Sequence, residues 1–131
     1  MPPPKEKVKQ ISCGYDFTLT VTHDGNLYAC GQNFLQKLNI TNTTKLTQID
    51  LGSTKVEKVK AGYTVMALIL VNHEGNKELW SAGNNGKGAL GSGEGVILKS
   101  AFGRMSYDSG NIQFVDMDIY TDHACALTED G

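Results

Sequence analysis

The stretch that decides the fold is VKQISCGYDFTLTVTHDGNLYACGQN, residues 8–33, because the chain repeats it. The stretch VEKVKAGYTVMALILVNHEGNKELWSAGNN, residues 56–85, has the same series of features about fifty residues later. A third copy, FVDMDIYTDHACALTEDG, occupies residues 114–131. Repetition on this scale indicates one supersecondary unit that the chain uses several times.

The copies match position by position. The matching residues, given copy by copy, are Val8, Ile11 and Gly14, then Val56, Val59 and Gly62, then Phe114, Met117 and Tyr120. Farther along, each copy has an acidic residue followed by glycine, at Gly25, Gly75 and Gly131. The third copy is the least regular, because Tyr120 stands where the others have glycine.

Each copy predicts a β-hairpin. The runs FTLTVT, VMALILV and ACALT are short and β-prone, and each leads into an acidic residue and glycine, a pair that permits positive φ in a turn. A second strand, NLYAC or KELWSA, follows in the first two copies. Because such a unit exposes an apolar face, neighbouring units must cover it, and short strands favour propeller blades over a helical solenoid.

Composition agrees with an all-β fold and excludes some partners. The chain has 131 residues, 40% of them apolar, and 15 glycines, which fits a single strand-rich domain. A net charge of −2 gives no general reason to expect nucleic acid or an anionic membrane as a partner. The sequence has no apolar run of about 20 residues and no signal-peptide pattern at its start, so we expect an intracellular protein, cytoplasmic or nuclear.

No cluster of residues predicts a metal or catalytic centre. The three cysteines, Cys13, Cys30 and Cys125, have no metal-binding or disulfide spacing, so we expect small buried side chains. The histidines His23, His73 and His123 are evenly spaced, but His123 occupies a different repeat position from the other two. No serine or cysteine has the context of a nucleophile, so no catalytic residue is predicted.

The glycines Gly86, Gly88 and Gly91 have the spacing of a dinucleotide-binding turn. That turn needs a helix that begins within the motif, whereas this chain continues as SGEGVILKSAFG without helical periodicity. The glycines are better explained as turn positions of the repeat, and no cofactor is predicted.

Together these patterns resemble the repeats of the regulator of chromosome condensation family. LWSAGNNGKGALG, residues 79–91, is similar to the Gly-x-Asn-x-x-Gly-Gln-Leu-Gly end of that repeat, and LYACGQNFLQKLN, residues 27–39, is a weaker match. The structural repeat positions that the resemblance gives are Gly14, Gly25, Gly31, Asn33, Gly62, Gly75, Trp80, Gly83, Asn85, Gly88, Gly91 and Gly131.

The resemblance implies a seven-bladed β-propeller of four-stranded antiparallel blades. The chain holds about two and a half repeats, so we expect a partial propeller. Its expected divisions are an N-terminal tail at 1–7, repeat 1 at about 8–55, repeat 2 at about 56–113 and an incomplete repeat 3 at about 114–131. Because the sequence ends inside a predicted hairpin, we expect it to be part of a longer protein, and open sheet edges predict self-association of the chain alone.

By resemblance, the expected function is a non-catalytic scaffold for protein–protein interaction. The alternative is part of a guanine-nucleotide exchange factor, with a small GTPase as partner. The segment 91–111 is the most variable connection, and we expect its Arg104 and Tyr107 to contact a partner. The repeat-registered aromatics have two interpretations, packing between blades or anchoring of a partner, and they are Tyr15, Tyr28, Tyr63 and Trp80.

Overall fold

Every regular element that the structure describes is a β-strand. The structure is a computed structural model that describes residues 6–31, 45–84, 98–104, 112–121 and 123–131, with the side chains of residues 84 and 98–104 left out. The strands are β1 (Val8–Cys13), β2 (Phe17–Thr22), β3 (Leu27–Gly31), β4 (Thr47–Ile49), β5 (Lys55–Ala61), β6 (Val65–Val71), β7 (Lys77–Asn84), β8 (Leu98–Arg104), β9 (Phe114–Ile119) and β10 (Ala124–Thr128).

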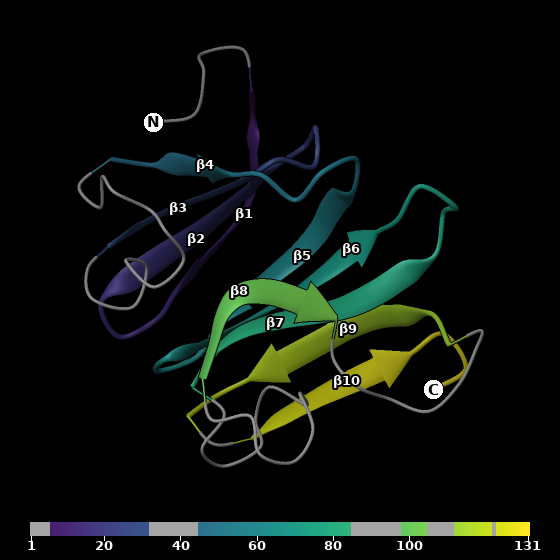
Figure 1. The fold of residues 1–131 in the computed structure, drawn as a ribbon. Helices are drawn as coiled ribbons and strands as arrows, with labels where there is room; N and C mark the ends of the chain where they lie inside the picture. Colours follow the sequence, from purple (N-terminus) through teal and green to yellow (C-terminus); the bar gives the residue numbers. More distant parts are fainter. Residues whose placement is uncertain (1–5, 32–44, 85–97, 105–111, 122) are drawn as a thin grey trace.

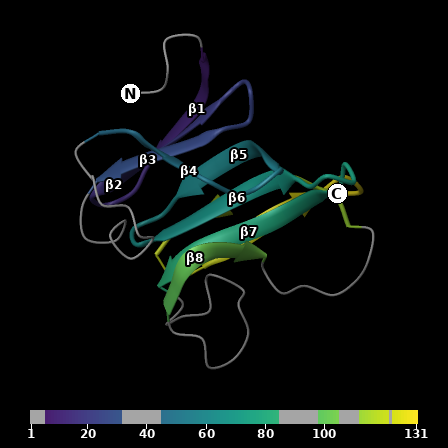
Figure 2. The same cartoon turned by 45° about the horizontal axis from the view of Figure 1, so that its top comes forward.

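The strands form three antiparallel sheets that follow one another along the chain. Blade 1 has the strand order β1-β2-β3-β4, blade 2 has the order β5-β6-β7-β8, and β9 pairs with β10 in the third sheet. Figure 1 shows the three sheets one after another in chain order, and Figure 2 shows blades 1 and 2 side by side. The predicted all-β fold and partial propeller are therefore confirmed.

The first two strands of each unit pair in the same register. Each pair has an irregularity one residue after the first apolar position, between Val8 and Gln10, between Val56 and Lys58, and opposite Leu127 and Thr128 in the third sheet. A bulge of this kind adds a residue to one strand and re-aims the side chains beyond it. The register makes two sets of residues equivalent: Gln10, Lys58 and Asp116, and then Ser12, Lys60 and Asp118.

Two hydrophobic cores lie between the sheets rather than within them. In the first core, Leu19 and Val21 of blade 1 pack against Val56 and Val59 of blade 2. In the second core, Ala67 and Ile69 of blade 2 pack against the third sheet. The residues of the third sheet in that core are Phe114, Met117 and Ile119. The apolar positions that open each repeat are therefore the side chains that dock a sheet onto the one before it.

Two glycine positions explain why the repeats keep glycine there. Gly75 has φ of 85° in the turn between β6 and β7, a conformation that costs other residues energy, and Gly25 is similar at 84°. Gly62 has an ordinary φ but lies against the third sheet, where a Cβ would stand 2.5 Å from the carbonyl oxygen of Tyr120. The first position needs a left-handed backbone, and the second needs room.

Two sequence predictions require correction. The connection at 91–111 is not loop throughout, because residues 98–104 form β8 on the edge of blade 2. The cysteines are not buried: Cys13 and Cys125 are exposed and Cys30 is half-buried. By register, Cys125 is equivalent to Leu19 and Ala67, which are buried because the next sheet covers them. Among the described residues no sheet covers β10 in this way, so Cys125 is exposed.

Candidate protein interface at the blade turns

The turns between the first and second strands of the three units lie next to one another. The backbone N–H of Tyr15, after β1, donates to the carbonyl of Tyr63, after β5, at 3.1 Å. The close approach of Gly62 to the carbonyl of Tyr120 places the turn after β9 beside them. Each turn is closed by its own backbone hydrogen bond, for example from Gly62 N–H to Val65 O at 2.8 Å. The three turns therefore lie side by side at this end of the molecule and contact one another.

Two tyrosine rings stack across the boundary between blades 1 and 2. The ring centroids of Tyr15 and Tyr63 are 4.5 Å apart with an interplanar angle of 37°, which is within the range of favourable aromatic pairs. The pair is nevertheless open to solvent, since Tyr15 is 67% and Tyr63 44% exposed. The rings therefore pack between the blades, which is one of the two sequence interpretations, and the anchoring of a partner stays a prediction.

The hydroxyl of Tyr63 keeps its proton at neutral pH. Partial desolvation raises the pKa of this phenol, and the neighbouring Tyr15 and the carboxylate of Asp16 raise it further. A neutral phenol beside a carboxylate offers both a donor and an acceptor. The surface around the tyrosine pair is therefore amphipathic, as are the aromatic anchors of many protein interfaces.

The third turn adds a smaller aromatic pair. The rings of Tyr120 and His123 are 6.3 Å apart, and Tyr120 is exposed. The backbone of this turn is closed by Tyr120 N–H donating to the carbonyl of His123 at 3.0 Å. The three adjacent turns thus carry exposed aromatic side chains. Because hydrogen bonds already hold the backbone of each turn, little conformational entropy would be lost there on binding a partner.

The first strands of the units carry a second polar feature, on the edge of each sheet. The side-chain oxygen of Gln10 accepts a hydrogen bond from Val59 N–H, and that of Ser12 accepts one from Ala61 N–H, both at 2.9 Å. These amides belong to the edge strand β5, whose outward N–H groups would otherwise lack partners. Blade 1 thus covers the edge of blade 2 with side chains.

The same positions are charged between blade 2 and the third sheet. Lys58 lies 3.5 Å from Asp116 and Lys60 lies 3.9 Å from Asp118. Each aspartate also accepts the N–H of its following residue, and this backbone hydrogen bond, followed by Lys58, holds the pKa of Asp116 below its usual range. Sequence reasoning missed this row, although polar residues alternating with the apolar positions are the expected pattern of a half-buried strand.

The other aromatics pack inside the molecule. Tyr28 is buried and its hydroxyl donates to Glu6 at 2.6 Å, while Asn26 Nδ2 donates to the other oxygen of that carboxylate. Burial and the glutamate raise the pKa of Tyr28 to about 12. Trp80 is half-buried against the first core, and its indole N–H donates to Glu78 at 3.2 Å. These two rings are structural.

The structure does not bring Arg104 to the tyrosine pair. Arg104 ends β8 and pairs with Trp80 in the middle of β7, whereas Val65, beside the turn of Tyr63, pairs with Gly83. The side chain of Arg104 lies outside the description. The repeat positions with positive φ are Gly25, Gly31, Gly75, Gly83 and Gly131. Among the sequence-predicted positions, those outside the described residues are Asn33, Asn85, Gly88, Gly91 and Tyr107.

Within the described ranges, no group of three or more His, Cys, Asp or Glu side chains is arranged to hold a metal ion. The three histidines lie on different parts of the units: His23 and His73 are in the turns that follow β2 and β6, and His123 precedes β10. No helix in this part of the chain has the length and apolarity needed to cross a membrane.

Comparison with known proteins agrees with the repeat architecture. Residues 8–35 match the model of the regulator of chromosome condensation repeat. The chain is 30% identical over 122 residues to the X-linked retinitis pigmentosa GTPase regulator of Canis lupus familiaris, covering 92% of this chain and 12% of that protein. It is 27% identical over 131 residues to the secretion-regulating guanine nucleotide exchange factor of Bos taurus, covering 95% of this chain and 28% of that protein.

The fold is also similar to that of solved protein structures. Prp20p from Saccharomyces cerevisiae superposes with a TM-score of 0.81 at 17% identity, covering 98% of this chain and 32% of that chain. The chain thus spans about a third or less of each of these proteins. The match at residues 8–35 agrees with the structure, in which the strand register repeats from unit to unit and a core lies between successive sheets. Residues 8–35 therefore match a repeat of the regulator of chromosome condensation type, and nearly the whole chain is similar to the proteins named above.

Proposed function

We propose that the chain is a non-catalytic scaffold for protein–protein interaction, built from propeller repeats in an intracellular protein of the cytoplasm or nucleus. The observation that carries this proposal is the exposed, stacked pair of Tyr15 and Tyr63 on turns that hydrogen bonds tie together. Tyrosines on a rigid backbone supply contact area at a low cost in conformational entropy. We assign the tail to residues 1–7 and the repeats to about 8–55, 56–113 and 114–131.

The known partners of similar proteins support a protein ligand. Prp20p is described by its binding to Gsp1p and histones, and a solved complex contains Kap60 bound to the same yeast protein. We place the main contact of this chain on the tyrosine pair. Arg104 and Tyr107 remain a second proposed contact region, on a different part of blade 2 from the turn of Tyr63.

The test is a capture experiment with matched variants. The wild-type chain, the double variant Tyr15→Ala/Tyr63→Ala and the double variant Arg104→Ala/Tyr107→Ala are immobilised, and the proteins that each retains are quantified. A control variant, His23→Ala/His73→Ala, removes two exposed rings from the turns after β2 and β6. We expect the tyrosine variant to retain at least tenfold less of a partner that the control retains in full. Equal retention by the tyrosine variant would reject this surface.

A second candidate function is guanine-nucleotide exchange on a small GTPase. It is favoured by the similarity to the secretion-regulating guanine nucleotide exchange factor, which extends over nearly the whole chain. If the chain or the protein containing it is an exchange factor, it accelerates the release of labelled nucleotide from one member of a small-GTPase panel. If nucleotide release is unchanged across the panel while protein capture is retained, the exchange function is rejected and only the scaffold function stands.

A further inference from the structure

The bulged residues of the three first strands meet in one cavity. One residue in each of these strands has no partner in the register: Lys9 in β1, Glu57 in β5 and Val115 in β9. A bulge turns side chains out of the regular alternation of a strand. These residues line a cavity with a volume of about 310 Å³. The other residues in its wall are Gln10, Lys58 and Lys77. The cavity therefore borders all three sheets.

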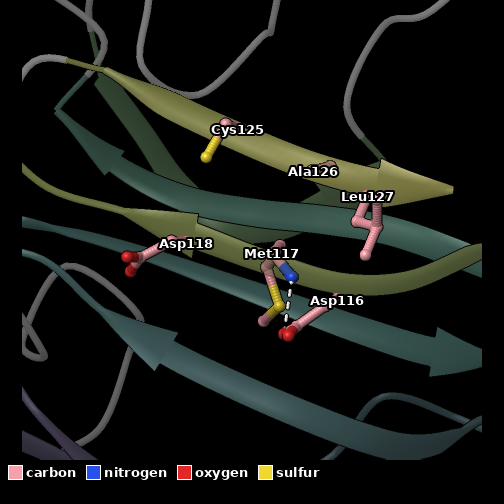
Figure 3. Close-up of a pocket in the computed structure, with 6 residues that line it drawn as sticks. All are labelled: Asp116, Met117, Asp118, Cys125, Ala126 and Leu127. Carbon is pink, nitrogen blue, oxygen red and sulfur yellow. Dashed lines mark hydrogen bonds between the residues drawn. The ribbon is translucent and has the colours of Figure 1, made fainter. Parts of the chain in front are cut away.

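The wall of this cavity is positively charged, although the chain as a whole has a net charge of −2. It holds three ammonium groups and one carboxylate, and Lys77 Nζ lies 3.3 Å from Glu57 Oε2. Lys58 lies 3.5 Å from Asp116, which lines a different cavity, between β9 and β10 (Figure 3). Lys9 has no acidic partner among the described residues. The cavity thus keeps an excess positive charge even when Asp116 is counted.

The wall also offers hydrogen-bond donors from separate elements. An ammonium group has three N–H bonds, so Lys58 and Lys77 retain donors beside those that face their carboxylates. The amide oxygen of Gln10 accepts Val59 N–H at 2.9 Å, which holds this side chain in place. Its donor atom, Nε2, has no partner among the described residues. Donors therefore reach the cavity from β1, β5 and β7.

A phosphate group matches these donors better than a carboxylate does. Its oxygens point in several directions, so it can accept hydrogen bonds from three strands at once, and lysine binds phosphate as a point charge. A carboxylate has only two oxygens, which lie in one plane. A volume of about 310 Å³ is at the lower end of the range for small-molecule sites. The cavity is thus of a size for a small ligand.

We propose that this cavity binds a small phosphate-bearing molecule. Lys9, Lys58 and Lys77 supply the charge, and the Nε2 group of Gln10 supplies a hydrogen bond. Glu57 is the wall residue that repels the ligand, and its ion pair with Lys77 limits that repulsion. The site goes beyond the scaffold function, because none of its residues belongs to the turns that carry the tyrosine pair.

Calorimetric titration of the full chain with inorganic pyrophosphate tests the site. Wild type is expected to bind it saturably, and Lys9→Gln and Lys77→Gln are each expected to bind roughly fivefold more weakly, because each loses one contacting charge. Glu57→Gln is expected to bind about twofold more tightly, because a repulsive charge is removed. Lys60→Gln is the matched control: it changes the net charge as Lys9→Gln does, but Lys60 does not line the cavity, so its affinity stays at the wild-type value. Circular dichroism checks that each variant folds.

Three results of the titration would overturn the proposal. They are no saturable binding by wild type, equal weakening by Lys60→Gln and Lys9→Gln, which would indicate diffuse surface charge, and a Glu57→Gln variant that binds no more tightly. A short polyglutamate peptide is titrated in parallel, and an affinity equal to that of pyrophosphate would reject the assignment to phosphate.

Amide chemical shifts of the wild-type chain locate the site without any substitution. On addition of pyrophosphate, the shifts are expected to change at Lys9, Lys77 and Val59, whose N–H contacts Gln10. The amides of Tyr15 and Tyr63 are expected to keep their shifts. Changes centred on another part of the chain would contradict the proposed site. Partner capture by Lys9→Gln is expected to equal that of wild type, so the two proposals can fail separately.

Discussion

Tyr15 and Tyr63 are joined twice, by rings 4.5 Å apart and by a 3.1 Å hydrogen bond from the N–H of Tyr15 to the carbonyl of Tyr63. Because the residues belong to different blades, this double link fixes the turn of blade 1 against the turn of blade 2. A flexible pair of exposed rings would lose conformational freedom on binding a partner, whereas a fixed pair loses less. The link therefore connects blade stacking to the proposed interface.

The close approach at Gly62 predicts a stacking defect when a side chain is added. Gly62→Ala places a Cβ 2.5 Å from the carbonyl oxygen of Tyr120, so the third sheet must move, and we expect a loss of about 1–3 kcal/mol in the free energy of unfolding. Gly75→Ala is the matched control, because a Cβ there has free space and only its positive φ costs energy, about 1 kcal/mol.

Urea unfolding measures both variants, and amide hydrogen exchange distinguishes their causes. Gly62→Ala is expected to accelerate exchange in the third sheet, while Gly75→Ala leaves exchange there unchanged. Equal exchange rates in both variants would contradict the account of how the third sheet docks.

The side-chain cover of the β5 edge predicts a local exchange effect. Gln10→Met keeps the length of the side chain but removes the oxygen that accepts Val59 N–H. Leaving a part-buried amide without an acceptor costs about 1–2 kcal/mol. We expect faster exchange of the Val59 amide in this variant, with the Ala61 amide, held by Ser12, as the internal control. Unaltered exchange at Val59 would show that the Gln10 contact is not formed in solution.

The buried phenol of Tyr28 predicts a pH dependence of stability. Its pKa is raised to about 12 in the folded chain from an ordinary value of 10.0, by burial first and by the hydrogen bond to Glu6 next. Since folding favours the protonated phenol, its contribution is complete below pH 10.0 and is lost as the pH rises toward about 12. Tyr28→Phe is expected to have a flatter fall in unfolding free energy across this window, and an identical fall in both proteins would contradict the assignment.

Alanine substitutions at equivalent positions of adjacent units are expected to lower the free energy of unfolding by very different amounts. Ile69→Ala empties a fully buried site between blade 2 and the third sheet and is expected to cost about 2–5 kcal/mol. Leu127→Ala changes the equivalent site on a face that no described sheet covers, and it is expected to cost about 0.5 kcal/mol or less in dilute solution. Urea denaturation at low protein concentration compares them, and similar costs would mean that the face of Leu127 is covered in the monomer.

The repeat and most of its strands followed from the sequence, because apolar positions and acidic-glycine turns recur in it. The strands β2, β6 and β10 lie where the runs FTLTVT, VMALILV and ACALT predicted them. Strand β8 did not, because an edge strand within a glycine-rich connection has no clear alternation. The exposure of Cys125 also could not be predicted, since it is set by how the sheets pack against one another and not by the residue type.

The candidate interface was only partly predictable. Tyr15 and Tyr63 stand at equivalent repeat positions, so the sequence identified them as a registered pair. Whether such rings are buried or exposed depends on the angle between adjacent sheets, which spacing along the chain does not encode. Arg104 and Tyr107 were chosen because their segment is variable, and the pairing of Arg104 with Trp80 places it away from the turns.

The most direct test of the scaffold account is site-specific photocrosslinking from the tyrosine pair. A photoreactive phenylalanine analogue replaces Tyr63 in one sample and the exposed His73 of the opposite turn in a matched sample. The account predicts a covalent adduct with a partner protein from position 63 and none from position 73, with the adduct lost in the presence of excess unlabelled wild-type chain. Adducts of equal yield from both positions, or none from position 63 while the partner is still captured, would contradict it.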